Sequence, residues 1–260
     1  RIYNGATSNN VLVTVGAIEA NYIATQSLVG RGEEIVIMLP NYMQIWGISK
    51  NREYKIKTFS LLEEKDWAPD LDKLENIVTE KTKLIAICNP NNPTGYILKD
   101  SEMDAIISIA ERVGAWILAD EVYGGAEQLT DEETPSFYGR YERVIAVGSL
   151  SKAYGLPGLR TGWLVGPEDV VDDIWARHEY LTLSVSMLSN KLAALAMSPE
   201  IRPSIIKRTR DYIRKGYPVL KEWMEKQEIF NGVPPQAAAI AFIKYDLDIN
   251  STALTNRLVN

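Results

Sequence analysis

A lysine and an arginine lie close together in the stretch SLSKAYGLPGLRTGW, residues 149–163, which follows an apolar run. The amine of a lysine can bond covalently to a carbonyl carbon. A guanidinium can bind a phosphate through two parallel hydrogen bonds. Lys152 precedes Arg160 by eight residues, so the stretch combines a nucleophile with an anion-binding group. A lone lysine in a loop is more often simply solvated, and the interpretation therefore depends on what surrounds it.

Two further apolar runs end in polar side chains. The run Lys83–Cys88 precedes NPNNPTGY, in which prolines and a glycine indicate a fixed turn that presents the amide of Asn92. The run Ala115–Ala119 precedes DEVYGG, which begins with the carboxylate Asp120 and brings Tyr123 three residues later. Taken one at a time, these would be a turn residue, a helix cap and a core aromatic.

A fourth group follows the run Val11–Val15. The next residues are GAIEAN, where Gly16 permits a tight turn into a helix. The first N–H groups of a helix have no partner within it and attract anions. The segment Gly16, Ala17 and Ile18 is therefore a candidate anion site.

The elements that carry these groups alternate between strand-like runs and helical periodicity. The predicted strands are residues 11–15, 34–39, 83–88, 115–119 and 143–147. The clearest predicted helix is Asp100–Val113, with a start signal at Ser101 and Asp104 and a stop at Gly114. This alternation predicts an α/β fold, a mostly parallel doubly wound sheet flanked by helices. Ligands bind beyond the carboxyl ends of such strands, so the polar groups are expected to converge there.

The pattern changes after about Pro199. A long charged helix is predicted over Arg202–Lys226, then a strand over Ala239–Tyr245 and a helix over Ser251–Val259. We expect a large α/β domain over residues 1–198 and an incomplete α+β small domain over residues 199–260. Because the sequence begins without methionine and stops within a predicted helix, we expect a fragment of a longer protein.

Composition narrows the class of protein. Of 260 residues, 46% are hydrophobic and 24% charged, and the net charge of −6 is not gathered in blocks, which argues against a nucleic-acid partner. The apolar runs are too short to cross a bilayer, so we expect a cytoplasmic protein. A single cysteine, Cys88, excludes an internal disulfide, and with one histidine no metal site is expected. We expect His178 on the surface of a helix or at an interface, and we assign it no role.

Together the converging groups match one small molecule, pyridoxal phosphate, which carries an aldehyde, a basic ring nitrogen, a ring hydroxyl and a phosphate. Lys152 would form the Schiff base, and Asp120 would pair with the ring nitrogen and keep it protonated. Asn92 and Tyr123 would hydrogen-bond the ring hydroxyl. The remaining candidates would bind the phosphate: Ser149, Ser151 and Arg160, with the helix start at Gly16, Ala17 and Ile18.

Three stretches, NPNNPTG, ADEVY and SLSKAYGLPGLRTGW, resemble the class I/II aminotransferases, pyridoxal-phosphate enzymes of fold type I. They occur in the family's order and with its lysine-to-arginine spacing, and the resemblance covers roughly residues 10–245. LPNY, residues 39–42, is similar to the segment that stacks an aromatic ring, here Tyr42, on the cofactor. The resemblance implies a homodimer that exchanges the amino group of an L-amino acid with a 2-oxo acid through Lys152.

Other functions stay open at this stage. The same cofactor supports lyases, synthases and oxidases that act on amino acids, and fold analogy cannot separate them. A non-catalytic module that binds pyridoxal phosphate is a further alternative. A hydrolase using Ser151 and Lys152 is disfavoured because adjacent residues seldom face each other. The family's arginine for the substrate carboxylate and its partner-subunit residues are expected to lie outside this chain.

Overall fold

An eight-stranded sheet forms the centre of the computed structural model, which describes residues 2–259. Its strands are β1 (Val11–Thr14), β2 (Glu34–Leu39), β3 (Lys55–Leu62), β4 (Ala68–Pro69), β5 (Thr82–Cys88), β6 (Trp116–Asp120), β7 (Val144–Ser149) and β8 (Gly162–Val165). The helices are α1 (Ala17–Leu28), α2 (Gln44–Asn51), α3 (Leu71–Ile77), α4 (Asp100–Val113), α5 (Glu168–His178), α6 (Met187–Ala196), α7 (Arg202–Glu225) and α8 (Ser251–Val259).

The strands lie side by side in the order β1-β8-β7-β6-β5-β2-β3-β4. From β7 to β3 every neighbouring pair is parallel, which confirms the mostly parallel sheet. Strand β8 is antiparallel to both β7 and β1. Strand β1 therefore runs in the same direction as β7, and the residues that follow β1, β5, β6 and β7 meet at one edge of the sheet.

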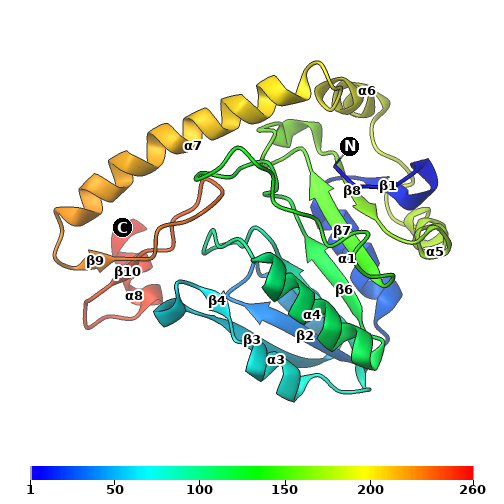
Figure 1. Ribbon diagram of the computed structural model, residues 1–260, viewed down its shortest axis with the longest axis horizontal. Coiled ribbons are helices and arrows are strands. Elements are labelled where there is room, and N and C mark those ends of the chain that lie inside the picture. The colour runs from blue at the N-terminus through cyan, green and yellow to red at the C-terminus, as the bar shows by residue number, and fades with distance from the viewer. Residues whose placement is uncertain (1, 260) are drawn as a thin grey trace.

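Helices cover both faces of the sheet, as predicted for a doubly wound fold. Figure 1 shows α4 in front of the strands and α1 behind them. Side chains alternate along each strand, so that in β5 Leu84 packs into the cluster of α1 and α2, whereas Ile85 packs into the cluster of α3 and α4. Strand β5 is apolar at successive positions because both of its faces are buried.

Helix α4 has the predicted bounds, but it begins with a different capping interaction. The expected signal joined Ser101 to Asp104; instead, the Glu102 carboxylate accepts a hydrogen bond from the backbone N–H of Lys99 at 2.8 Å. This pairing satisfies an N–H that the helix itself leaves free. Gly114 ends the helix with φ of 69°, a left-handed conformation that glycine adopts without steric cost.

The chain after α6 leaves the sheet along α7, which ends one residue before the predicted bound (Figure 1). The predicted strand Ala239–Tyr245 is largely wrong: only β10 (Lys244–Tyr245) is a strand, paired antiparallel with β9 (Phe230–Asn231). Strand β9 is only two residues long, so its backbone can pair with Lys244 and Tyr245 but not with the residues before them. Helix α8 has the predicted bounds.

Candidate functional site

Strand register brings the predicted phosphate-binding residues to one place. Gly162, the first residue of β8, is paired with Thr14 at the end of β1 and with Ser149 at the end of β7. The turn after β1 and the loop before β8 therefore lie against each other. They also approach closely, because a Cβ on Gly162 would overlap the backbone nitrogen of Ala17.

The guanidinium of Arg160 lies against the start of α1. Its Nη1 donates to Ser151 Oγ at 3.3 Å and to the carbonyl of Pro157 at 3.1 Å. A Cβ on Gly16 would lie 2.5 Å from Arg160 Nη2, and Gly16 has φ of 77° and ψ of 167°, a conformation that is essentially restricted to glycine. The structure thus brings Gly16, Ser151 and Arg160 together at a helix N-terminus.

The carboxylate of Asp120 lies at the end of β6, half-buried between α1 and the loop that follows. Its Oδ1 accepts from the backbone N–H of Val122 at 3.2 Å, and its Oδ2 accepts from Asn21 Nδ2 at 2.8 Å. Burial raises the pKa of Asp120, while these two hydrogen bonds and the charge of Lys152 act in the opposite direction. Lys152 is therefore close enough to Asp120 for their charges to interact.

Lys152 and Asn92 meet at Tyr123. The Nζ of Lys152 lies 5.9 Å from the centre of the Tyr123 ring. Asn92 Nδ2 donates to the Tyr123 hydroxyl at 3.3 Å, and burial raises the pKa of that hydroxyl. These contacts join the loops after β5, β6 and β7, so the expected convergence at the sheet edge is present for these three residues.

The remaining predicted residues lie at the borders of this region. Ala17 packs in the small apolar cluster that contains Tyr123, and Ile18 is half exposed on the first turn of α1. Tyr42 is also half exposed and interacts electrostatically with Tyr123. Ser149 is buried, and its Oγ accepts from the backbone N–H of Ser151 at 3.2 Å.

The start of α1 is supported by two side chains that the sequence analysis did not single out for this role, Glu19 and His178. Glu19 accepts from the backbone N–H of Val15 at 2.6 Å and from the hydroxyl of Thr182 at 2.7 Å. His178 lies 3.4 Å from Glu19 and is buried, so its expected place on a helix surface is wrong. The sequence did offer a sign of these contacts, because the stretch GAIEAN contains the polar residues Glu19 and Asn21. Both lie on the buried side of α1.

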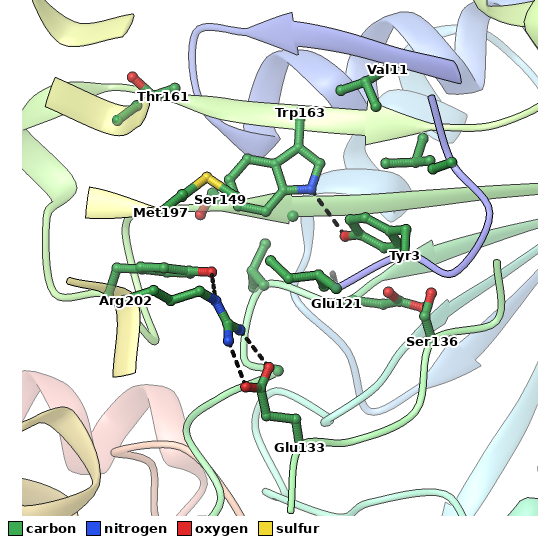
Figure 2. Close-up of a pocket in the computed structure, with 18 of the residues that line it drawn as sticks. Tyr3, Val11, Glu121, Glu133, Ser136, Ser149, Thr161, Trp163, Met197 and Arg202 are labelled. Atoms are coloured by element: carbon green, nitrogen blue, oxygen red, sulfur yellow. Dashed lines mark hydrogen bonds and ion pairs between the residues drawn. The ribbon is translucent and has the colours of Figure 1, made fainter. Parts of the chain in front are cut away.

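A cavity of about 920 Å³ lies on the face of the sheet opposite to α1. Its lining includes Trp163 and Val165, whose neighbour Leu164 packs with α1 on the opposite face. Figure 2 shows that polar groups of this cavity are paired with one another: Trp163 donates to the hydroxyl of Tyr3 at 3.0 Å, and Arg202 bonds Glu133. Neither Lys152 nor Asp120 lines it.

The sequence and the fold of this chain were compared with those of known proteins. The profile of the family described as aminotransferase class I and II matches residues 4–260. A PLP-dependent aminotransferase from Streptococcus suis superposes with a TM-score of 0.91 at 31% identity, covering 99% of this chain and 67% of that one.

Two curated relatives have related sequences. Capreomycidine synthase of Streptomyces vinaceus is 31% identical over 252 residues, which are 96% of this chain and 64% of that protein. An aspartate aminotransferase of Pyrococcus horikoshii is 33% identical over 177 residues, which are 68% of this chain and 45% of that protein. This chain thus spans about half to two thirds of these relatives. With the family profile matched over nearly every residue and the fold shared with the Streptococcus structure, the chain belongs to the class I and II aminotransferase family.

Proposed function

We propose that this chain forms part of a pyridoxal-phosphate-dependent aminotransferase that exchanges the amino group of an L-amino acid with a 2-oxo acid. The observation that carries the proposal is the placement of Lys152 Nζ over the ring of Tyr123 and within electrostatic range of Asp120. The similarity to the aspartate aminotransferase of Pyrococcus horikoshii supports the same activity. The roles of individual residues below belong to this proposal.

The phosphate end of the cofactor fits the region around Arg160. The side chains that bond Arg160 supply a hydroxyl rather than a carboxylate, so its positive charge is available to an anion. The N–H of Gly16 already donates to the Thr14 carbonyl at 2.8 Å, so the helix start contributes the first-turn N–H groups of Ala17 and Ile18. The Ser151 hydroxyl accepts from Arg160, and Ser149 adjoins it by accepting from the Ser151 backbone N–H. A side chain at Gly16 would fill the space that this arrangement leaves against the guanidinium.

The ring of the cofactor fits the residues around Asp120. A half-buried carboxylate is suited to hold a protonated ring nitrogen, because partial removal from water strengthens the attraction between opposite charges. Asn92 and the hydroxyl of Tyr123 would bond the ring hydroxyl, and the exposed ring of Tyr42 would cover one face of the cofactor.

When bound through its aldehyde to Lys152, pyridoxal phosphate supplies a ring that accepts electrons from the substrate's α-carbon. The protein's part is to position that carbon and to move its proton. The amine of Lys152 is the candidate general base at the α-carbon, and Tyr123 keeps that amine close by through the contact with its ring. Asp120 would maintain the positive charge of the ring nitrogen.

The similarity to capreomycidine synthase supports a second candidate, a pyridoxal-phosphate lyase, synthase or oxidase that acts on an amino acid. The two functions differ in their need for an amino acceptor. The test supplies amino acids to the loaded protein with and without a 2-oxo acid. Amino-group transfer that requires the 2-oxo acid supports the aminotransferase; release of ammonia or a cyclised product without it supports the second function. Cofactor binding without any turnover would reject both.

Arg160→Met is expected to weaken pyridoxal phosphate binding by roughly 10–100-fold, because it removes charged hydrogen bonds to the phosphate. Arg160→Lys keeps the positive charge but cannot form the bidentate hydrogen bonds of a guanidinium, so an intermediate loss of affinity is expected. Titration of the cofactor-free chain, followed by protein fluorescence, measures both dissociation constants. Equal affinity in Arg160→Met and the unsubstituted chain would contradict the assigned role. Pyridoxal, which lacks the phosphate, should bind both proteins equally and serves as the control ligand.

We also propose that the protein is a homodimer whose interface includes residues 180–195. This segment exposes large apolar side chains, of which Tyr180 is 87% exposed, Met187 74% and Leu188 68%. Large exposed apolar side chains that gather in one segment favour a contact site there. Leu188→Glu is expected to shift the chain from dimer to monomer in sedimentation velocity, because a charge would be buried without a partner. A matched change at the exposed Val219 of α7, Val219→Glu, should leave the dimer intact; a monomeric unsubstituted chain would reject the proposal.

Two further expectations belong to the same proposal. The division into a large domain, residues 1–198, and the start of a small domain, residues 199–260, is supported by the departure of α7 from the sheet. The proposal includes a cytoplasmic location. In residues 2–259 no helix is both long and apolar enough to span a membrane.

A further inference from the structure

Asn21 is a buried amide that contacts the carboxylate of Asp120 from the second turn of α1. Its side chain is 2% exposed, and its Nδ2 donates to Asp120 Oδ2 at 2.8 Å. Within residues 2–259 its Oδ1 has no hydrogen-bond partner. The contacts of the amide are thus made through its two N–H groups, and one of them is directed at the carboxylate.

The second N–H of Asn21 is directed at Gln44, the first residue of α2. Gln44 Oε1 accepts from Asn21 Nδ2 at 3.4 Å, and Gln44 Nε2 donates to the backbone carbonyl of Ile18. Because Nε2 is committed to a carbonyl, the oxygen of Gln44 must face Asn21. This in turn orients the nitrogen of Asn21 toward Asp120.

Three hydrogen bonds link Ile18, Gln44, Asn21 and Asp120 into one chain across the proposed cofactor site. It starts at Ile18, next to the proposed phosphate site, passes through Gln44, two residues after Tyr42, and ends at the oxygen of Asp120. The chain therefore connects the segments proposed to hold the phosphate, the ring face and the ring nitrogen.

We propose that Asn21, oriented by Gln44, is a positioning residue that fixes the direction and preserves the negative charge of the Asp120 carboxylate toward the cofactor's ring nitrogen. The inference rests on the proposed function, because it assigns Asp120 to the ring nitrogen. Asn21 itself acts through Asp120 and does not carry out a chemical step.

The electrostatic surroundings of Asp120 explain why a positioning residue is needed. Burial raises the pKa of Asp120 and favours its neutral form, which could not hold a protonated ring nitrogen. The hydrogen bond from Asn21 is the strongest influence in the opposite direction, ahead of the Val122 N–H and the charge of Lys152. The ionisable groups that interact with Asp120 are Lys152, Glu121, Tyr123, Cys88 and Tyr3.

The test replaces Asn21 with leucine, which has nearly the same size and cannot donate a hydrogen bond. In the cofactor-free chain of 260 residues, ¹³C NMR of the Asp120 carboxyl should show titration at a higher pH in Asn21→Leu. With ¹⁵N-labelled pyridoxal phosphate bound, the ring-nitrogen shift should move toward the unprotonated value. The dissociation constant of pyridoxal phosphate should rise about tenfold or more, the effect of losing a hydrogen bond to a charged group.

Two comparison variants separate positioning from general damage to α1. Thr25→Val removes a buried hydrogen bond one turn further along the same helix, from Thr25 Oγ1 to the Asn21 carbonyl, and should leave the Asp120 titration and the ring-nitrogen shift unchanged. Gln44→Leu should change both in the same direction as Asn21→Leu, by less.

An unchanged Asp120 titration in Asn21→Leu, or a change of the same size in Thr25→Val, would overturn the inference. A different result would reject the proposed function: an unsubstituted chain that does not bind pyridoxal phosphate at Lys152. In that case the titration in the cofactor-free chain still measures whether Asn21 preserves the charge of Asp120.

Discussion

Lys152→Ala is expected to remove the absorbance band of covalently attached pyridoxal phosphate and to lower amino-group transfer by about 10³-fold. The change deletes the amine that we propose attaches the cofactor and acts as general base at the substrate's α-carbon. The loss should be in turnover, because Arg160, Ser151 and the start of α1 remain available to bind the phosphate. Absorbance spectra and single-turnover transfer with an amino acid measure the two effects.

The matched control is Lys50→Ala. Lys50 also places its ammonium over an aromatic ring, with Nζ 5.2 Å from the centre of the Trp46 ring, but it lies on α2 away from the strand ends. Its removal should leave the absorbance band and the transfer rate unchanged. A Lys152→Ala protein that keeps the band would show that another lysine carries the cofactor, and the proposed function would have to be abandoned for this site.

The sequence sufficed to predict the parts of the site that depend on strand ends. Asp120 and Asn92 follow apolar runs that became β6 and β5, and parallel neighbours bring such ends together in any doubly wound sheet. The bounds of α4 could also be predicted, because its apolar periodicity is continuous and Gly114 ends it.

The parts that could not be predicted depend on contacts between distant segments. Strand β8 is short and antiparallel, and its four residues have no alternation of polar and apolar side chains to mark them as a strand. Nothing in the neighbourhood of His178 indicates that it is buried against Glu19, because that contact joins the end of α5 to the start of α1. The role of Asn21 likewise appears only when α1 is laid against β6.

Asp120→Asn is expected to lower amino-group transfer by about 10²–10³-fold, the usual cost of removing one preorganised electrostatic contact from an active site. The substituted side chain would keep a similar shape and could still accept from Asn21. It would no longer carry the negative charge that we propose holds a proton on the ring nitrogen, so the ring would withdraw electrons less strongly. Transfer rates and the ¹⁵N shift of the bound ring report the two consequences.

The neighbouring carboxyl provides the control. Burial raises the pKa of Glu121 to about 8, so this group is mostly neutral at pH 7, and it bonds Ser136 and the Phe137 N–H rather than the groups around Lys152. Glu121→Gln should therefore leave the transfer rate at pH 7 within a few-fold of the unsubstituted protein. An equal loss in both variants would mean that any change to the end of β6 damages the site, and the specific role of Asp120 would be rejected.

The same Asp120→Asn variant should be more stable than the unsubstituted protein when no cofactor is bound. Because burial raises the pKa of Asp120, the folded state holds its proton more tightly than the unfolded chain, in which an aspartate titrates near about 3.9. Above that pH the charged carboxylate costs stability in the folded state, and the cost grows until the pH exceeds the folded pKa. Urea unfolding below about pH 3.9, where the aspartate of the unfolded chain is protonated, and at pH 8 should therefore show an advantage for the variant that is larger at pH 8. A variant that is less stable at both pH values would mean that the charge of Asp120 stabilises the folded protein on its own, without a cofactor.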